Sequence, residues 1–126
     1  ATATRHMVKF AVLFHKPLPD RMPEFETYYT RFLALVEQIP SITRRQVVDV
    51  LGSPQGESKY YRVLEFYFED QPAMTAALTT EAGQRAGSML YLVFKPHGYR
   101  FETFFADVYE ETGGHTPASP TNEDTP

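Results

Sequence analysis

Apolar residues follow two different spacings along the first third of the chain. Residues 8–14 (VKFAVLF) form a nearly continuous apolar run rich in β-branched and aromatic side chains, which predicts a strand covered on both faces. Residues 22–39 instead repeat large apolar side chains at the 3.6-residue spacing of a helix. Pro23 suits a first helical turn and Pro40 ends the pattern, so we expect one helix between them.

The middle and the end of the chain continue this alternation. Two strand-like runs, residues 42–51 and 59–68, are joined by a turn-rich linker and predict a hairpin. Asp70 and Pro72 predict the start of a second helix, with another helical start at Thr80. The pattern leaves the type of residues 89–94 open. A turn and an apolar run over residues 99–108 then predict the last strand.

The predicted order is β-α-β-β-α-β, which is the ferredoxin-like α+β plan of one antiparallel sheet with both helices on one face. The other face of such a sheet is polar when the domain is monomeric. Here the first strand carries Phe10 and Val12 on one face but Ala11 and Leu13 on the other. Because an apolar sheet face of that size promotes association, we expect a homodimer that closes through its sheet faces.

Length, charge and composition narrow the class of protein. The 126 residues fit one domain, and a net charge of −4 with scattered basic residues argues against a nucleic-acid partner. With no cysteine and no apolar run long enough for a membrane span, we expect neither thiolate metal sites nor membrane insertion, and cytoplasmic residence. We place the domain at residues 8–109, after a flexible or cloning-derived segment 1–7 and before a polar tail 110–126.

Several motifs of this chain resemble those of the EthD family, named for ethyl tert-butyl ether degradation, within the dimeric α+β barrel superfamily. They are Tyr28-Tyr29, Ile39-Pro40, VLGSPQG at 50–56, YYRVLEFYFED at 60–70 and TTEAGQRA at 79–86. The resemblance implies a homodimeric barrel with a pocket in each half. In related barrels that pocket hosts cofactor-free oxygenation, lactone isomerisation, aromatic-polyketide cyclisation or haem chemistry; for this chain we expect no cofactor.

The helix motif departs from the family pattern Tyr-Tyr-x-x-His-x-Pro-Leu. Phe32 stands at the histidine position and Ala34 at the proline position. Phenylalanine neither transfers a proton nor binds a metal, so a mechanism that rests on that imidazole does not carry over. We expect Tyr28, Tyr29 and Phe32 to pack mainly in the core. The alternative is that they line a substrate cavity reached by one tyrosine hydroxyl.

Glu65 is an acid within an otherwise apolar strand and is our first candidate for a catalytic group. If Val50 pairs with Tyr60, antiparallel counting places Arg45 opposite Glu65 and Asp49 opposite Tyr61. The resulting face predicts a substrate-binding set of Arg45, Asp49, Tyr61 and Tyr67 around Glu65. The alternative is a structural Arg–Glu pair at the dimer interface.

His15, at the end of the first strand, is the second catalytic candidate, because it shares a face with Lys9, Ala11 and Leu13. The histidine spacings and the absence of an HExxH motif predict no metal site. Two classes of function stay open. One is a cofactor-independent isomerase, cyclase or monooxygenase-like enzyme acting on a small hydrophobic, aromatic or polyketide-like molecule. The other is a non-catalytic small-molecule-binding or accessory protein of an oxygenase system.

Overall fold

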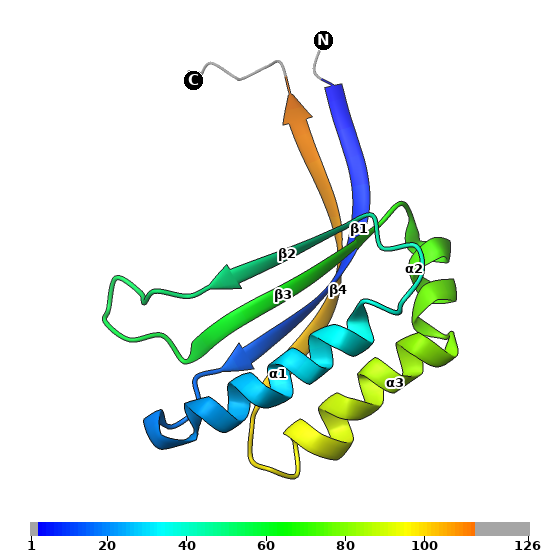
Figure 1. The fold of residues 1–126 in the computed structure, drawn as a ribbon. Helices are drawn as coiled ribbons and strands as arrows, with labels where there is room; N and C mark the ends of the chain where they lie inside the picture. The colour runs from blue at the N-terminus through cyan, green and yellow to red at the C-terminus, as the bar shows by residue number, and fades with distance from the viewer. Residues whose placement is uncertain (1–2, 113–126) are drawn as a thin grey trace, which may run out of the picture.

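One four-stranded sheet and a layer of helices make up the protein, in a computed structural model that describes residues 3–112 (Figure 1). The elements are β1 (Ala3–His15), η1 (Pro19–Arg21), α1 (Met22–Val36), β2 (Arg44–Asp49), β3 (Tyr60–Phe68), α2 (Gln71–Leu78), α3 (Glu81–Met89), η2 (Leu90–Phe94) and β4 (Phe101–Thr112). The strands lie in the order β2-β3-β1-β4, and every pairing is antiparallel. The predicted ferredoxin-like α+β fold is confirmed.

Local capping explains where the second helical segment divides. The carboxylate of Asp70 accepts a hydrogen bond from the Ala73 amide at 2.9 Å, and the hydroxyl of Thr80 accepts one from Gly83 at 3.1 Å. A side chain at Gly83 would lie 2.5 Å from the Leu78 carbonyl oxygen, so only glycine allows this close approach of α2 and α3. The segment after α3, whose type the sequence pattern did not decide, is a π-helix, η2.

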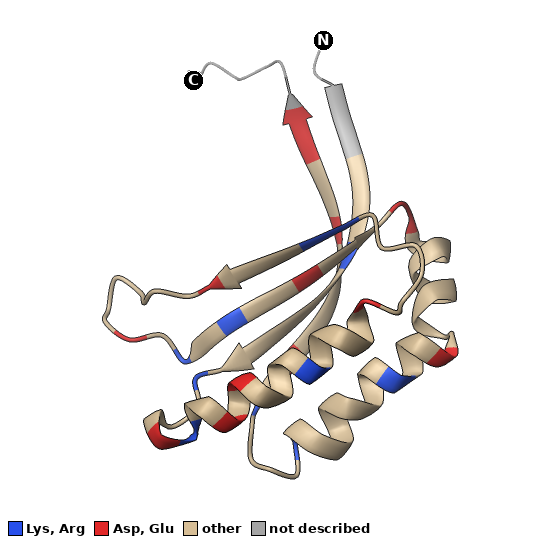
Figure 2. Cartoon of the chain, viewed as in Figure 1, with Lys and Arg blue, Asp and Glu red and all other residues tan. Residues whose placement is uncertain are grey.

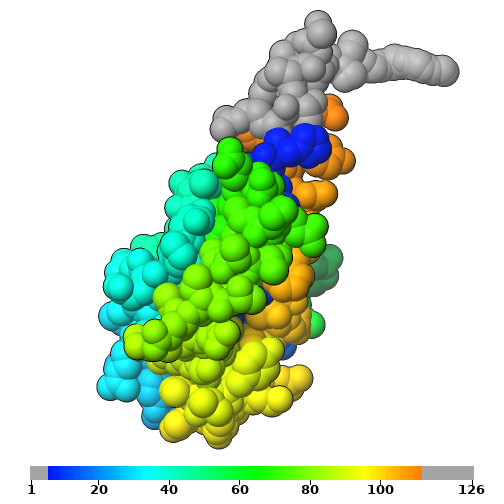
Figure 3. All heavy atoms as spheres, turned by 90° about the vertical axis from the view of Figure 1, so that its right-hand side faces the viewer, coloured from blue at the N-terminus to red at the C-terminus, as the bar shows by residue number. Residues whose placement is uncertain are grey.

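Large aromatic side chains fill the space between the sheet and the helices. Phe14 of β1 meets Phe25 and Phe32 of α1 edge to face, and Phe94 of η2 closes the same cluster. All four are at most 1% exposed. Figure 3 shows α2 and α3, coloured green to yellow, packed beside α1, coloured blue to cyan, on the surface of the molecule. Burial of these rings is the main contribution to stability on this side of the sheet.

A ribbon of two strands extends beyond the sheet. β1 begins at Ala3, which pairs with Thr112, whereas β3 reaches β1 only from Val8 onward (Figure 1). The strands extend past the predicted domain boundaries at residues 8 and 109, because residues 3–7 pair with residues 108–112. Within residues 3–112, no third strand pairs with this ribbon. The remainder of the predicted tail, 113–126, lies outside the described residues.

Candidate functional site

Strand register decides which candidate residues share a face. β2 pairs with β3 so that Gln46 lies opposite Glu65, Arg45 opposite Phe66 and Asp49 opposite Arg62. This differs by one residue from the predicted pairing, and a one-residue slip moves every side chain of a strand to the other face. The predicted placement of Arg45 and Asp49 beside Glu65 is therefore wrong. Both lie on the helix-covered side, where Arg45 forms an ion pair at 3.5 Å with Glu37, the C-cap residue of α1.

Tyr61 also leaves the face on which the alternation placed it. The pairing of β1 with β3 shifts between Phe14 and His15, which is the signature of a β-bulge. Consecutive side chains of β3 then reach the same helix, because Tyr61 and Arg62 both contact Glu26 of α1. The prediction that Tyr61 lies beside Glu65 is wrong for this reason.

A mostly buried ion pair lies near the centre of the sheet face that no helix of the described residues covers; we call this the open face. Glu65 accepts hydrogen bonds from Lys9 Nζ at 2.5 Å and from Gln46 Nε2 at 3.3 Å. The Lys9 and Glu65 side chains are only 18% and 11% exposed. Figure 2 shows an acidic position near the middle of β3. Lys9 Nζ also lies 5.9 Å from the ring centroids of Tyr67 and Phe104. Of the predicted set, the structure thus brings Glu65 and Tyr67 together.

Lys9 and Gln46 are members of this site that the sequence did not single out. The signal for Lys9 was present, because β1 alternates and Lys9 shares the face of Ala11 and Leu13. Finding it required the β1–β3 register, in which Ala11 pairs with Glu65. Finding Gln46 required the β2–β3 register, which no sequence signal fixed.

Apolar side chains surround the ion pair on the open face. Ala11 is fully buried, Leu13 and Val63 are half-buried, and Val48 and Phe104 are 37% and 43% exposed. The rings of Tyr67 and Phe104 offer flat aromatic surfaces beside Lys9. A charged pair within an apolar, partly aromatic surface is typical of sites for small organic molecules.

His15 belongs to the other end of the open face. Its Nε2 lies 2.8 Å from one carboxylate oxygen of Glu102, and the Tyr60 hydroxyl donates to the other at 2.7 Å. These hydrogen bonds, from Tyr60 first and then His15, hold the pKa of Glu102 below its ordinary value. Four residues of strand separate His15 from Ala11, the partner of Glu65, which corresponds to about 13 Å. The two catalytic candidates therefore do not meet.

The displaced residues form a separate polar cluster between α1 and the sheet. Arg62 donates to Glu26 at 2.8 Å and to Asp49 at 2.6 Å, while its guanidinium carbon lies 4.5 Å from the ring centroid of Tyr29. Hydrogen bonds from Arg62 lower the pKa of Glu26, and the bond to Glu26 raises the pKa of Tyr61. Each charge in this cluster has its partner, which indicates a structural role.

The helix motif packs mostly in the core. Phe32 is 1% exposed and Tyr29 6%, whereas Tyr28 is half-buried against Phe94, His97 and Tyr99. These contacts favour the packing interpretation of Phe32. The Tyr29 hydroxyl is buried and meets no hydrogen-bond partner within residues 3–112, and burial raises its pKa.

Metal-ligand clusters and membrane-spanning helices are both absent from the part of the chain that the structure describes. Across residues 3–112, no three histidine or carboxylate side chains group closely enough to hold a metal ion. In the same part of the chain, no helix has the length and apolar character to cross a membrane.

Known structures share this fold. No protein-family model matches the chain, and no curated protein matches its sequence. An EthD-family protein from Bacillus halodurans C-125 is 28% identical with a TM-score of 0.68, over 79% of this chain and 96% of that one. The resemblance to the EthD family is confirmed.

Two other structures share the EthD-like fold at lower identity. A dimeric protein of unknown function with a ferredoxin-like fold from Bacteroides fragilis has a TM-score of 0.54 at 18% identity, covering 81% of this chain and 94% of its own. SnoaB from Streptomyces nogalater, a cofactor-independent oxygenase, has a TM-score of 0.52 at 15% identity, covering 91% and 99%. At these identities the likeness shows the fold alone.

Proposed function

We propose that this protein is a homodimer that binds a small aromatic or otherwise hydrophobic molecule on its open face, with the Lys9–Glu65 pair at the ligand's polar group. The observation that carries the proposal is the position of this pair at the centre of an apolar surface. No helix of the described chain covers that surface. The dimeric relative with the same fold supports a second copy as the cover.

Energetics favour a ligand role for the ion pair over a purely structural one. Removing two charges from water costs several kcal/mol per ion, and apolar residues of similar volume stabilise an interface equally well or better. A dimer interface without a ligand gains little from an acid and a lysine at this position. A ligand with a hydroxyl or carbonyl group gains a hydrogen-bond acceptor from Glu65 and a donor from Lys9.

The pair also suits proton transfer. With the ligand's acidic O–H or C–H against the Glu65 carboxylate, Glu65 accepts the proton and the Lys9 ammonium stabilises the resulting anion. Isomerisation, cyclisation and cofactor-free oxygenation of aromatic molecules share this proton removal as a step. SnoaB, a cofactor-independent oxygenase with the same fold, supports the last of these.

A second candidate function is non-catalytic binding, as in an accessory protein of an oxygenase system. It is favoured by one observation: Phe32 replaces the family's histidine and is buried among Phe14 and Phe94. In that case the open face still binds a ligand, but the ligand leaves unchanged.

Native mass spectrometry of the freshly purified protein tests both parts of the proposal. We expect twice the mass of the 14.4 kDa chain, with any co-purified molecule seen as an added mass. A titration with 2-naphthol, an aromatic alcohol with a fluorescent ring, then reports binding. Glu65→Gln should weaken it about tenfold or more, because the charged acceptor is lost. The matched control is Glu81→Gln, which removes a carboxylate from an exposed pair with Arg85 on α3.

Each outcome of these measurements bears on a different part of the proposal. A monomer at micromolar concentration would contradict the proposal that a second copy covers the open face. A dimer whose 2-naphthol affinity is equal in the wild type, Glu65→Gln and Glu81→Gln contradicts the ligand role of the pair. If a co-purified molecule is bound but returned chemically unchanged after prolonged incubation in air, the non-catalytic function is favoured.

A further inference from the structure

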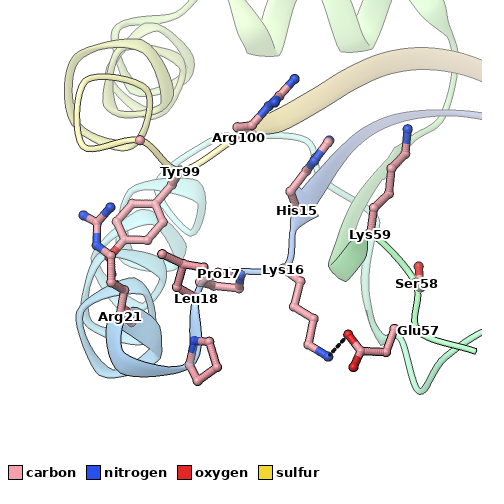
Figure 4. Close-up of a pocket in the computed structure, with 12 residues that line it drawn as sticks. His15, Lys16, Pro17, Leu18, Arg21, Glu57, Ser58, Lys59, Tyr99 and Arg100 are labelled. Carbon is pink, nitrogen blue, oxygen red and sulfur yellow. Dashed lines mark hydrogen bonds and ion pairs between the residues drawn. The ribbon is translucent and has the colours of Figure 1, made fainter.

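A hollow lies at one end of the sheet, away from the Lys9–Glu65 pair. Its volume is about 520 Å³, and it lies between the end of β1, the loop before β3 and the loop before β4 (Figure 4). This volume falls within the range of small-molecule sites. The charged and imidazole side chains on its wall are His15, Lys16, Arg21, Glu57, Lys59 and Arg100.

The wall of this hollow is basic although the protein is acidic. Four of its side chains are permanently positive and one is negative, while the whole chain has a net charge of −4. Two of the cations are neutralised, because Lys16 lies 3.3 Å from Glu57 and Arg21 lies 2.8 Å from Glu24. Among the described side chains of residues 6–111, neither Lys59 nor Arg100 forms an ion pair within 4.0 Å, although the charge of Lys59 helps to lower the pKa of the nearby Glu102 carboxyl.

The backbone, rather than any attraction between side chains, brings these cations together. The His15 amide donates to the Arg100 carbonyl at 2.9 Å, and the Lys16 amide donates to the Lys59 carbonyl at 2.8 Å. These bonds pin three segments that are far apart in sequence. Figure 4 shows Arg100, His15 and Lys59 standing next to one another at the rim. Lys59 and Arg100, held on neighbouring segments, outnumber the one carboxylate beside them, Glu102, and leave a positive potential that attracts an anion.

The rest of the wall is apolar and shaped by a glycine. Pro17, Leu18 and Tyr99 line the hollow beside the cations. Gly98 adopts a positive φ of 85°, and a side chain there would meet the Arg21 guanidinium at 3.3 Å. That guanidinium lies over the Tyr99 ring, 4.4 Å from its centroid. The hollow thus pairs a cationic rim with an apolar floor.

We infer that this hollow is a binding site for a small organic oxyanion, either a carboxylate or a phosphate ester. Lys59 and Arg100 bind the anionic group, and Pro17, Leu18 and Tyr99 contact the organic body. The volume exceeds that of an inorganic anion, which is why an organic body is part of the inference. The site is independent of the proposed function, because none of its lining residues contacts Lys9 or Glu65.

Amide chemical-shift titrations on the intact protein test the site with three probes at constant ionic strength. Phenyl phosphate and benzoate share a ring but differ in their oxyanion, and benzyl alcohol is the neutral control. We expect saturable shifts at His15, Lys59 and Arg100 with one or both anions. Lys59→Gln and Arg100→Gln should each weaken binding about tenfold, since each removes a charged donor. Arg85→Gln, at an exposed cation of α3, should leave the affinity unchanged.

The relative affinities of phenyl phosphate and benzoate identify the preferred oxyanion. The inference is overturned if shifts grow linearly without saturation, if benzyl alcohol binds as tightly as the anions, or if the affinity is equal in the wild type and both rim variants. Circular dichroism of each variant verifies folding. 2-Naphthol binding in the rim variants should equal that of the wild type, so failure here and failure of the proposed function are separable.

Discussion

The same strands form both faces of the sheet, but the two faces differ in how deeply their side chains are buried and in where their charged groups lie. On the helix-covered face, aromatic side chains are almost fully buried and the charged groups lie at the margin, in the Glu26–Arg62–Asp49 cluster. On the open face, Val48 and Phe104 are still exposed, and the charged pair Lys9–Glu65 lies at the centre. The first face is complete within one chain, whereas the second, under the proposed function, is covered by a second copy and binds a ligand.

The largest expected effect on stability comes from the helix-covered face. Phe32→Ala should lower the free energy of unfolding by about 3–5 kcal/mol, because it leaves a cavity beneath α1 that the rigid aromatic cluster does not fill. Leu92→Ala is the control, since Leu92 is 72% exposed and its truncation should cost less than about 0.5 kcal/mol. Urea unfolding measures both. Equal costs would show that Phe32 lines open space instead of core.

Adjacent residues of β2 allow a direct comparison of the two faces. Val48 points to the open face and Val47 to the helix side, and they are 37% and 45% exposed. Val48→Asp should weaken the dimer at least about a hundredfold, or about 2.7 kcal/mol, because two-fold symmetry places the new charge in the interface twice. Val47→Asp should leave the dimer intact. Sedimentation equilibrium reads out both, and equal dissociation would contradict the open-face interface.

Variants of the Lys9–Glu65 pair distinguish a structural role from a ligand-binding role. Glu65→Gln should cost about 2 kcal/mol of unfolding free energy, because it leaves the Lys9 ammonium buried without its counter-charge. The double variant Lys9→Met/Glu65→Leu should regain most of that stability, since it removes both charges. It should still fail to bind 2-naphthol tightly. If binding returns together with stability, the pair is structural.

The Glu26–Arg62–Asp49 cluster lies at the margin of the helix-covered face. Its variants should give the smallest change in unfolding free energy, and that change should depend on pH. The Arg62 hydrogen bonds lower the pKa of Glu26 in the folded state. This stabilisation is therefore present above the ordinary glutamate pKa of about 4.3 and is lost as the pH falls through the lower folded value. Glu26→Gln should cost about 1 kcal/mol at pH 7, a modest figure because Glu26 is 41% exposed. Urea unfolding at pH 3 should show almost no difference from the wild type.

The sequence predicted those parts of the fold that depend on local chemistry. The N-caps at Asp70 and Thr80 are where the motifs placed them, and the alternation in β1 correctly indicated apolar residues on both faces. The β2–β3 register failed by one residue because the ten residues between these strands do not constrain the pairing. Gly52 and Gly56 turn the chain by themselves, with a separate bridge between Ser53 and Gly56.

The candidate site was predicted only as far as single residues. Glu65 and Tyr67 lie together as expected, because strict alternation holds between positions 63 and 68 of β3. Tyr61 was misplaced, since a β-bulge has no signature in an apolar run. Lys9 and the cations of the hollow at the end of the sheet come from segments distant in sequence. Only the three-dimensional pairing of strand ends brings them together.

The position of β1 between β3 and β4 has a consequence for how the chain folds. Its partners in β3 are about 45–60 residues away in sequence, but its partners in β4 are roughly 90–110 residues away. During synthesis β1 is made early, and one of its edges has no native neighbour until β4 emerges from the ribosome. Contacts of such long sequence separation slow folding. The nascent protein therefore carries an unpaired apolar strand edge, which makes this interval the one in which it most needs protection from aggregation.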